Sequence, residues 1–260
     1  MSRTSNNISQ IQRLEVIRQQ LASNGEVFIA KLAKHFGVSE MTVRRDIDTL
    51  ESQGEVIRTH GGAASAKRLT FEFTFRANQQ KNIDAKCAIA VAALKHISDG
   101  QVVLLDTGTT TLELARLIAA KQKVTVITTS LAIVSELQFV NDVETILLGG
   151  FLRKGSPDIH GPLTEQNLVQ FKCDIAFVGA DAIDRNGTTY TDDLRVLNLD
   201  RQMARSAAKV IVLADSSKFG KRGMCRVFGH KEYHTLITDS GLDSCLIKAF
   251  NKIKIVCEIA

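Results

Sequence analysis

A run of small polar residues at 106–111 (DTGTTT) has the composition of a phosphate-binding loop. It follows an apolar stretch at 102–105 and opens a stretch with a helical pattern at 110–120. Glycine lets the backbone approach a ligand, threonines offer hydroxyl donors, and a helix N-terminus offers free N–H groups with a partial positive charge. Because the run matches neither the Walker loop nor G-x-G-x-x-G, an ordinary threonine-capped helix start explains it equally well.

Two more polar loops follow apolar stretches that have the composition of strands. Thr129 and Ser130 stand at a second predicted helix start, which favours a polar ligand beside the first loop. Asp181 and Asp184 follow a buried strand, where their carboxylates could bind sugar hydroxyls or act as acid and base. A plain strand-end turn with capping aspartates is the alternative.

Two basic loops could also contact an anion. Gly149 and Gly150 precede Arg153, so this loop could close over an anionic group. Lys218 follows two serines and could supply a point charge to a phosphate, although a surface lysine fits the same sequence. We find no cysteine and histidine spacing of a metal site and no G-x-S-x-G nucleophile motif, so we expect no metal, no cofactor and no catalytic residues.

The N-terminal quarter contains the pattern of a helix-turn-helix. Gly37 can end one short helix in the left-handed conformation, and Ser39 can cap the next helix. In that helix Val43, Ile47 and Leu50 recur at spacings of four and three, so one face points at a core. The other side, near the N-terminal end, carries Met41, Thr42, Arg44 and Arg45. In this motif that end enters the major groove of DNA.

Further elements surround this motif. The apolar spacing predicts helices at 8–23 and 28–36, and residues 56–63 predict two short strands around a Gly61-Gly62 turn. Residues 1–63 therefore predict a winged helix-turn-helix. Residues 64–81 are polar, with phenylalanines at every second position from 71 to 75, and we interpret them as a linker whose aromatic edge docks on one of the domains.

From residue 82 to 260 helical and strand patterns alternate. Helices are predicted at 82–97, 110–120, 131–139, 163–171, 194–207 and 242–250. Strands are predicted at 102–105, 124–127, 143–148, 175–178, 210–213, 236–238 and 253–256. Continuous apolar strands are buried on both faces, and alternation with helices predicts an open parallel α/β sheet whose ligands lie at the carboxyl ends of the strands.

Composition and charge agree with a soluble DNA-binding protein. The net charge is +5, and residues 1–68 contribute +3 of it, from ten Lys and Arg against seven Asp and Glu. Five cysteines without C-x-x-C pairs favour free thiols in a reducing compartment. We find no signal peptide and no apolar run of membrane length, so we expect a cytoplasmic protein that does not enter the membrane.

The chain resembles the DeoR-type family of bacterial transcriptional regulators. The resemblance rests on VSEMTVRRDIDTLESQGEVIRTHGGA at 38–63 and continues through DTGTTT, VITTS, LLGG, FVGADAID and LADSSKFG, which together span nearly the whole chain. It implies a C-terminal sensor domain that resembles ribose phosphate isomerase in fold and binds a small phosphorylated sugar. It also implies a homo-oligomer, a dimer or tetramer, that represses a carbohydrate operon on double-stranded operator DNA until the sugar releases it.

The resemblance also implies a role for individual residues. Those expected to contact DNA are Ser39, Met41, Thr42, Arg44 and Arg45, with Arg58 and His60 reaching the backbone from the wing. Those expected at the ligand are Asp106, Gly108, Thr109, Thr110, Thr111, Thr129, Ser130, Asp181 and Lys218. Arg45 and Asp46 could instead form an internal ion pair or cap. Many relatives carry Glu-Ala where this chain has Val196 and Leu197, so the resemblance does not specify the sugar.

Two other hypotheses compete with the ligand-gated repressor. An isomerase of a phosphorylated sugar with an appended DNA-binding arm would explain the GADAID segment, but the Lys-Gly-Gly run and the glutamate base of the isomerase are missing. A DNA-architectural protein without a ligand would not need so many polar strand-end loops. We therefore predict a regulator and not an enzyme.

Overall fold

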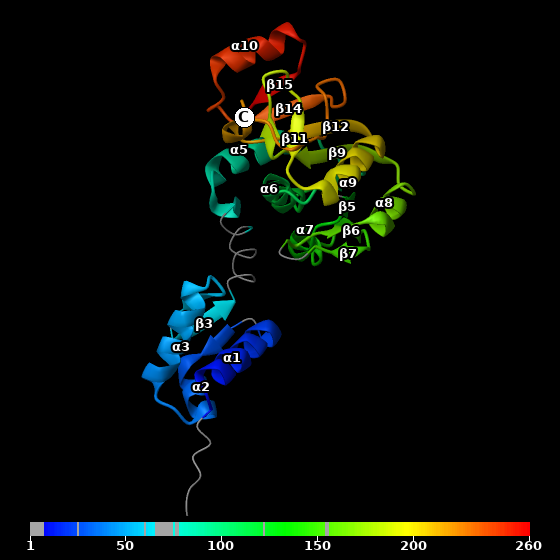
Figure 1. The fold of residues 1–260 in the computed structure, drawn as a ribbon. Helices are drawn as coiled ribbons and strands as arrows, with labels where there is room; N and C mark the ends of the chain where they lie inside the picture. The colour runs from blue at the N-terminus through cyan, green and yellow to red at the C-terminus, as the bar shows by residue number, and fades with distance from the viewer. Residues whose placement is uncertain are drawn as a thin grey trace, which may run out of the picture. The chain divides into compact units, whose positions relative to one another are not determined.

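The computed structural model describes residues 8–24, 26–59, 61–65, 75, 78–121, 123–153 and 156–260. The chain divides into two compact units, Met1–Arg76 and Ala77–Ala260 (Figure 1). Each unit has its own hydrophobic core. His60, predicted to contact DNA, and Phe71 and Phe73 of the predicted linker lie outside the described residues. None of the helices found in the described ranges is long and apolar enough to cross a membrane.

The described part of the N-terminal unit is a winged helix-turn-helix, as predicted. Its elements are α1 (Gln10–Asn24), β1 (Glu26–Phe28), α2 (Ile29–Phe36), α3 (Glu40–Ser52), β2 (Val56–Thr59) and β3 (Gly62–Ser65). The core of the unit is apolar, and its most deeply buried side chains, at most 1% exposed, include Ile17, Leu32, Val43, Ile47 and Leu50. Strand β1 was not predicted; it pairs with β3, so the order of this antiparallel sheet is β1-β3-β2.

The wing differs from the prediction at its turn. Thr59 pairs with Gly62, so Gly62 belongs to strand β3 and the predicted Gly61-Gly62 turn is wrong. A Cβ atom on Gly62 would lie 2.0 Å from the carbonyl oxygen of Val27, which means that the neighbouring strand β1 requires glycine at this place. The strand also continues through Ala64 and Ser65, two residues that the sequence analysis assigned to the linker.

The C-terminal unit is built on an open parallel sheet, as predicted. Seven strands lie in the order β15-β14-β12-β9-β4-β5-β6, and every pairing in this sheet is parallel. In chain order they are β4 (Val102–Leu105), β5 (Val124–Thr128), β6 (Val143–Leu147), β9 (Cys173–Gly179), β12 (Ala207–Leu213), β14 (Thr235–Thr238) and β15 (Cys257–Ile259). Their carboxyl ends form one edge of the sheet.

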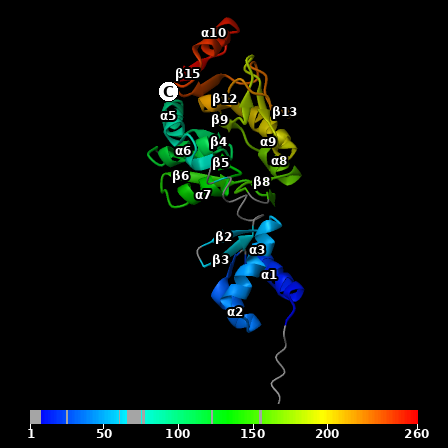
Figure 2. The same ribbon diagram turned by 60° about the vertical axis from the view of Figure 1, so that its left-hand side comes forward.

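Helices cover both faces of this sheet. One layer contains α5 (Ile83–Leu94), α6 (Thr109–Ile118) and α7 (Leu131–Leu137), and the opposite layer contains α8 (Pro162–Leu168) and α9 (Leu194–Arg205) (Figures 1 and 2). Central strand β9 contacts α6 on one side and α9 on the other, which explains why its apolar run shows no alternation. Helix α10 (Ser244–Lys252) packs against β15.

Short antiparallel strands beside the main sheet were not predicted. They are the pair β7 (Phe151–Leu152) and β8 (Ile159–His160), and the sheet of β10 (Ala182–Ile183), β11 (Thr189–Thr191) and β13 (Cys225–Arg226). A short 3-10 helix, η1 (Ser216–Lys218), follows β12. Elements of two or three residues have too few side chains to show a periodic pattern.

The last predicted strand, 253–256, is wrong. Lys254 has a φ of 61°, in the left-handed region, so the backbone turns there and cannot continue a strand. Ile255 is 5% exposed and belongs to the core, which explains the apolar signal in this stretch. The observed strand β15 starts only at Cys257.

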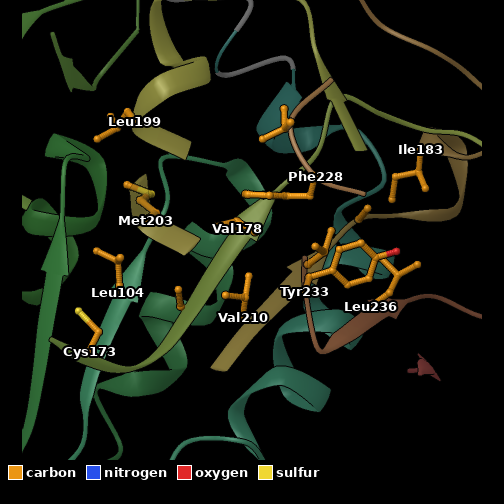
Figure 3. Close-up of a cluster of buried hydrophobic side chains, with 14 of the residues drawn as sticks. Leu104, Cys173, Val178, Ile183, Leu199, Met203, Val210, Phe228, Tyr233 and Leu236 are labelled. Carbon is orange, nitrogen blue, oxygen red and sulfur yellow. The ribbon is translucent and has the colours of Figure 1, made fainter. Parts of the chain in front are cut away.

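One large cluster of the core includes side chains of β9, β12 and the helix α9. Figure 3 shows Val178 and Val210 of these strands beside Met203 of α9, with Phe228 and Tyr233 closing the cluster. Each of these side chains is at most 6% exposed. Burial of a side chain of this size stabilises the fold by roughly 1.5–3 kcal/mol, so this cluster fixes the strand ends that carry the polar loops.

Candidate nucleic-acid interface and ligand site

The predicted recognition helix is α3, and its first turn is capped. The hydroxyl of Ser39 accepts a hydrogen bond from the backbone N–H of Thr42 at 3.2 Å, and the two hydroxyl groups lie 3.0 Å apart. Gly37 ends α2 with a φ of 66°, as the sequence predicted. Ser39 and Thr42 therefore organise the helix start, while they remain exposed or half-buried.

The outer face of α3 presents side chains that DNA could contact. Met41 is 61% exposed, and Arg44 and Arg45 are also exposed. Arg44 lies 3.7 Å from Glu40, while the side chain of Arg45 has no hydrogen-bond or ion-pair partner among the described residues. The alternative of a pair between Arg45 and Asp46 does not occur, because Asp46 binds Arg13 of α1.

The wing contributes one described basic side chain. Arg58 forms an ion pair with Asp48 and lies 3.4 Å from Glu51, both of which belong to α3. These side chains are about half exposed, so water and salt screen the pairs and DNA phosphates could compete for the guanidinium. In the structure Arg58 therefore ties the wing to the recognition helix.

The predicted ligand residues gather at the carboxyl edge of the parallel sheet, and Asp106 joins two of the strand ends. Its carboxylate accepts hydrogen bonds from the backbone N–H groups of Gly179, at 2.9 Å, and Thr107, at 2.6 Å. The pKa of Asp106 is raised above its usual value, mainly by burial and also by the charges of Asp158 and Asp181. The two hydrogen bonds oppose this rise in part. Asp106 thus links the end of β4 to the end of β9.

The threonines after Asp106 form the first turn of α6. Gly108 is the N-cap residue and supplies no side chain, so the first N–H groups of the helix have no side-chain cap. The hydroxyl of Thr111 lies 2.7 Å from the carbonyl oxygens of Asp106 and Gly108, and it holds the loop together. Thr109 is half-buried and Thr110 is 8% exposed. The uncapped N–H groups of this turn could bind an anion, and the hydroxyl of Thr111 holds the loop in place.

The second threonine loop contains one hydroxyl without a partner. Thr128 donates to the carbonyl of Leu105 at 2.9 Å, and Ser130 caps α7 by accepting from Ile133 at 3.3 Å. Between them, Thr129 is fully buried, and its hydroxyl has no hydrogen-bond partner within the described ranges. An unsatisfied buried hydroxyl costs free energy unless a ligand or water reaches it.

The loop at Gly149, Gly150 and Arg153 is built into the fold. A Cβ atom on Gly150 would lie 2.0 Å from the hydroxyl oxygen of Thr164 in α8, so Gly150 allows close packing. Arg153 donates to Asp158 at 3.0 Å and to Asp193 at 2.7 Å. Its charge is already compensated by two carboxylates, which leaves it less available to an anion than the sequence suggested.

The two aspartates of the 179–184 loop differ in their surroundings. Asp181 is exposed and accepts one hydrogen bond from the hydroxyl of Thr191 at 2.9 Å. Asp184 is 5% exposed and accepts from the backbone N–H groups of Asn186 and Thr188 and from the hydroxyl of Tyr190. Asp181 is therefore free to contact a ligand, while Asp184 holds the turn between β10 and β11.

Lys218 lies on η1, and the structure adds a second lysine that the sequence analysis missed. Lys86 of α5 is only 4% exposed. Burial lowers the pKa of Lys86, the carboxylate of Asp215 opposes this shift, and the ammonium of Lys218 adds to it. The spacing of Lys86 with the buried Ile89, Ala90 and Ala93 could have shown that this lysine lies on the core face of its helix.

A further carboxylate, Asp200 of α9, was also missed. It is half-buried, and its pKa is raised well above the usual value by burial and then by the charges of Asp106 and Asp181. The charges of Asp106, Asp181 and Asp200 thus act on one another at this edge, while Lys86 and Lys218 lie near the carboxylate of Asp215. Within the described ranges, no group of three or more His, Cys, Asp or Glu side chains could hold a metal ion.

A winged helix-turn-helix followed by an α/β unit with polar strand-end loops defines a class: a transcriptional regulator with a DNA-binding part and a sensor part. Comparison with known families agrees. Residues 13–68 match the DeoR-like helix-turn-helix domain, and residues 81–240 match the DeoR C terminal sensor domain. The chain belongs to the DeoR family of transcriptional regulators. It is a DNA-binding regulator and not the isomerase-like enzyme of the competing hypothesis.

Curated relatives extend over most of the chain. The lactose phosphotransferase system repressor of Lactococcus lactis subsp. lactis is 32% identical over 92% of this chain and 95% of its own length. The transcriptional repressor AccR of Agrobacterium fabrum is 35% identical over 82% and 83%. The L-fucose operon activator of Haemophilus influenzae is 30% identical over 91% and 94%. Both repressors and an activator are thus found among its relatives.

Solved structures include more distant similarities. A D-ribose-5-phosphate isomerase in complex with phospho-erythronic acid aligns with a TM-score of 0.39 and 23% identity, over 53% of this chain and 54% of that one. The Pyrococcus horikoshii OT3 translation initiation factor eIF-2B aligns with a TM-score of 0.41 and 18% identity, over 87% and 86%. At these identities the likeness concerns the fold and says nothing about activity.

Proposed function

We propose that this protein represses an operon for carbohydrate uptake or catabolism and that a phosphorylated sugar releases it from operator DNA. The observation that carries the proposal is the buried ammonium of Lys86 beside Lys218, at the sheet edge where α6 begins without a side-chain cap. Two lysines and free helix N–H groups attract a phosphate. Two relatives are named as regulators of a lactose phosphotransferase system and of an L-fucose operon, and these names support a sugar as the rest of the ligand.

The carboxylates of the same edge suit the sugar part of such a ligand. Asp181 and Asp200 have acceptor oxygens for hydroxyl groups, and Thr129 has a buried hydroxyl that lacks a partner among the described residues. Hydroxyl groups of a sugar could satisfy these side chains without introducing a second charge. A ligand with a phosphate at one end and hydroxyl groups at the other is therefore the best match to the site.

The DNA contacts belong to the proposal as well. We assign base and phosphate contacts to the outer face of α3, through Met41, Thr42, Arg44 and Arg45, with Ser39 at its start. Arg58 and His60 of the wing would contact the DNA backbone. We further propose a symmetric homo-oligomer, a dimer or tetramer, whose recognition helices bind half-sites about 10–10.5 base pairs apart.

Release follows from linkage between the two kinds of ligand. An effector weakens DNA binding only when it binds more tightly to the DNA-free state. A release of about 100-fold corresponds to roughly 2.7 kcal/mol of coupling free energy. By reciprocity, operator DNA must weaken effector binding by the same factor.

The test is a gel shift with the purified full chain on the DNA upstream of its own operon. Each sugar phosphate is compared with its unphosphorylated counterpart at one ionic strength, because binding to DNA depends steeply on salt. We expect a single phosphorylated sugar to reverse the shift. Release by the unphosphorylated sugar alone would contradict the phosphate site, and a shift that appears only with the effector would indicate an activator.

A further inference from the structure

The segment at 78–82, which joins the linker to the sensor unit, is hydrogen-bonded to the proposed ligand site. The ammonium of Lys86 donates to the carbonyl oxygen of Asn78. The side-chain amide of Asn82 donates to the carboxylate of Asp215 at 2.9 Å and lies 3.2 Å from the hydroxyl oxygen of Ser217. These contacts join residues far apart in the sequence at the edge that carries Lys218.

Asp215 connects this segment to Lys218. It is 3% exposed and accepts the backbone N–H of Ser217 at 3.1 Å, which makes it the N-cap of η1. The same carboxylate oxygen accepts the hydrogen bond from Asn82. A shift of η1 toward an anion would therefore strain or break the bond to Asn82.

The ammonium of Lys86 is buried, and the charges of Asp215 and Glu113 only partly offset the effect of that burial on its pKa. Among the described residues no carboxylate forms a salt bridge with its ammonium, and the carbonyl of Asn78 is the one hydrogen-bond acceptor that the ammonium contacts there. The nearby carboxylate of Glu113 is bound by Arg116 at 2.7 Å, and Asp215 is bound by Asn82. A buried ammonium held by one neutral oxygen is costly, and an anion is a better partner because charge-assisted hydrogen bonds are about twice as strong.

We propose that residues 78–82 act as a latch that the bound phosphate opens: Lys86 exchanges the carbonyl of Asn78 for the phosphate, η1 moves with Lys218, and Asn82 loses Asp215. This inference rests on the proposed function and adds how the sensor site signals along the chain. Residue 78 is connected to the DNA-binding unit through the intervening chain. The linker therefore transmits whether the hydrogen bonds of the latch are formed or broken.

Asn82 permits a clean test of the latch. Its φ is 54°, in the left-handed region, where alanine would introduce strain and glycine would not. Asn82→Gly therefore removes the side-chain bonds to Asp215 and Ser217 and keeps the backbone conformation. Lys123 also has a left-handed φ, of 56°, at the opposite end of the sheet before β5, so Lys123→Gly is a matched control.

The experiment is hydrogen exchange on the full chain with inorganic phosphate as the probe, against sodium chloride at equal ionic strength. Melting temperature reports binding, and exchange of the amides at 78–82 reports the latch. In the wild type and in Lys123→Gly we expect phosphate to raise the melting temperature and to speed exchange at 78–82 by about fivefold or more. In Asn82→Gly we expect the same rise in melting temperature and fast exchange with or without phosphate.

Two results would overturn the latch in distinguishable ways. If phosphate stabilises the wild type but leaves exchange at 78–82 unchanged, or if Asn82→Gly responds like the wild type, the latch is wrong and the phosphate site stands. If phosphate does not stabilise the wild type at all, the anion site of the proposed function is wrong, and the latch is wrong with it.

Discussion

Arg13 of α1 donates two hydrogen bonds to the carboxylate of Asp46 in α3, at 2.7 and 3.1 Å. Arg13 is 9% exposed and Asp46 is 1% exposed, and the guanidinium also donates to the carbonyl of Ile8 at 2.8 Å. The proximity of Asp46 raises the pKa of Arg13 against the opposing effect of burial. This buried pair fixes the orientation of the proposed recognition helix against the first helix.

Replacing Asp46 by alanine should therefore destabilise the N-terminal unit. Arg13 would remain buried without a counter-charge, and we expect the free energy of unfolding of this unit to fall by about 3–5 kcal/mol, measured by urea denaturation. Asp48→Ala is the control, because Asp48 is exposed on the same helix and its loss should cost less than about 1 kcal/mol. Equal losses in the two variants would contradict a special role for the buried pair.

Replacing Arg45 by alanine should weaken operator binding without unfolding the protein. The side chain is exposed and has no partner in the described part of the chain, so we expect stability to change by less than about 0.5 kcal/mol. Loss of a base contact should weaken binding by about 1–3 kcal/mol and relax the sequence preference. Loss of a phosphate contact should instead lower the slope of log affinity against log salt concentration by about 1. Unchanged affinity in a binding titration would remove Arg45 from the interface.

Replacing Thr129 by valine should separate ligand binding from stability. The buried hydroxyl has no partner within the described residues, so its loss should leave the free energy of unfolding unchanged within about 0.5 kcal/mol. Effector affinity, measured by calorimetry, should fall by roughly tenfold.

The adjacent Thr128→Val variant is the control for that measurement. The hydroxyl of Thr128 binds Leu105 and Ser130, so its loss should cost about 1–3 kcal/mol of stability. If Thr129→Val proved equally destabilising while effector affinity stayed the same, Thr129 would be a structural residue only.

Replacing Gly150 by alanine should destabilise the sensor unit. The new methyl group would lie 2.0 Å from the hydroxyl oxygen of Thr164 and 2.9 Å from the carbonyl oxygen of His160, and overpacking of this kind costs about 1–3 kcal/mol. Gly149→Ala should be tolerated, because its nearest atom would be 3.9 Å away on Asn167. Thermal unfolding of the two variants compares them, and similar melting temperatures would show that Gly150 is free to move.

The cysteines should differ strongly in reactivity toward a disulfide reagent at pH 8. Burial raises the pKa of Cys173 to about 11, with a smaller contribution from Asp174, so only about one thiol in a thousand is ionised at this pH. Cys245 is exposed and should react at least about 100-fold faster, measured by mass spectrometry of labelled peptides. In urea the two rates should converge, and rapid native labelling of Cys173 would contradict its burial.

The sequence alone determined the two parts of the chain and the edge of the sheet at which the polar strand-end loops lie. Apolar spacing in α3 and continuous apolar runs in β4 and β9 are local consequences of burial on one face or on both, so they can be read without a structure. Because parallel strands place their carboxyl ends together, Asp106 and Asp181 could be assigned to one edge from order along the chain.

Only the tertiary structure decided which of these polar side chains are already occupied. Arg153 is bound by Asp158 and Asp193, and Asp46 is bound by Arg13 from a different helix. Conversely, Lys86 belongs to the proposed ligand site because its helix packs it near η1, more than a hundred residues away along the chain. The physical reason is that hydrogen bonding and desolvation depend on neighbours brought together by packing, which a periodic pattern along one element does not contain.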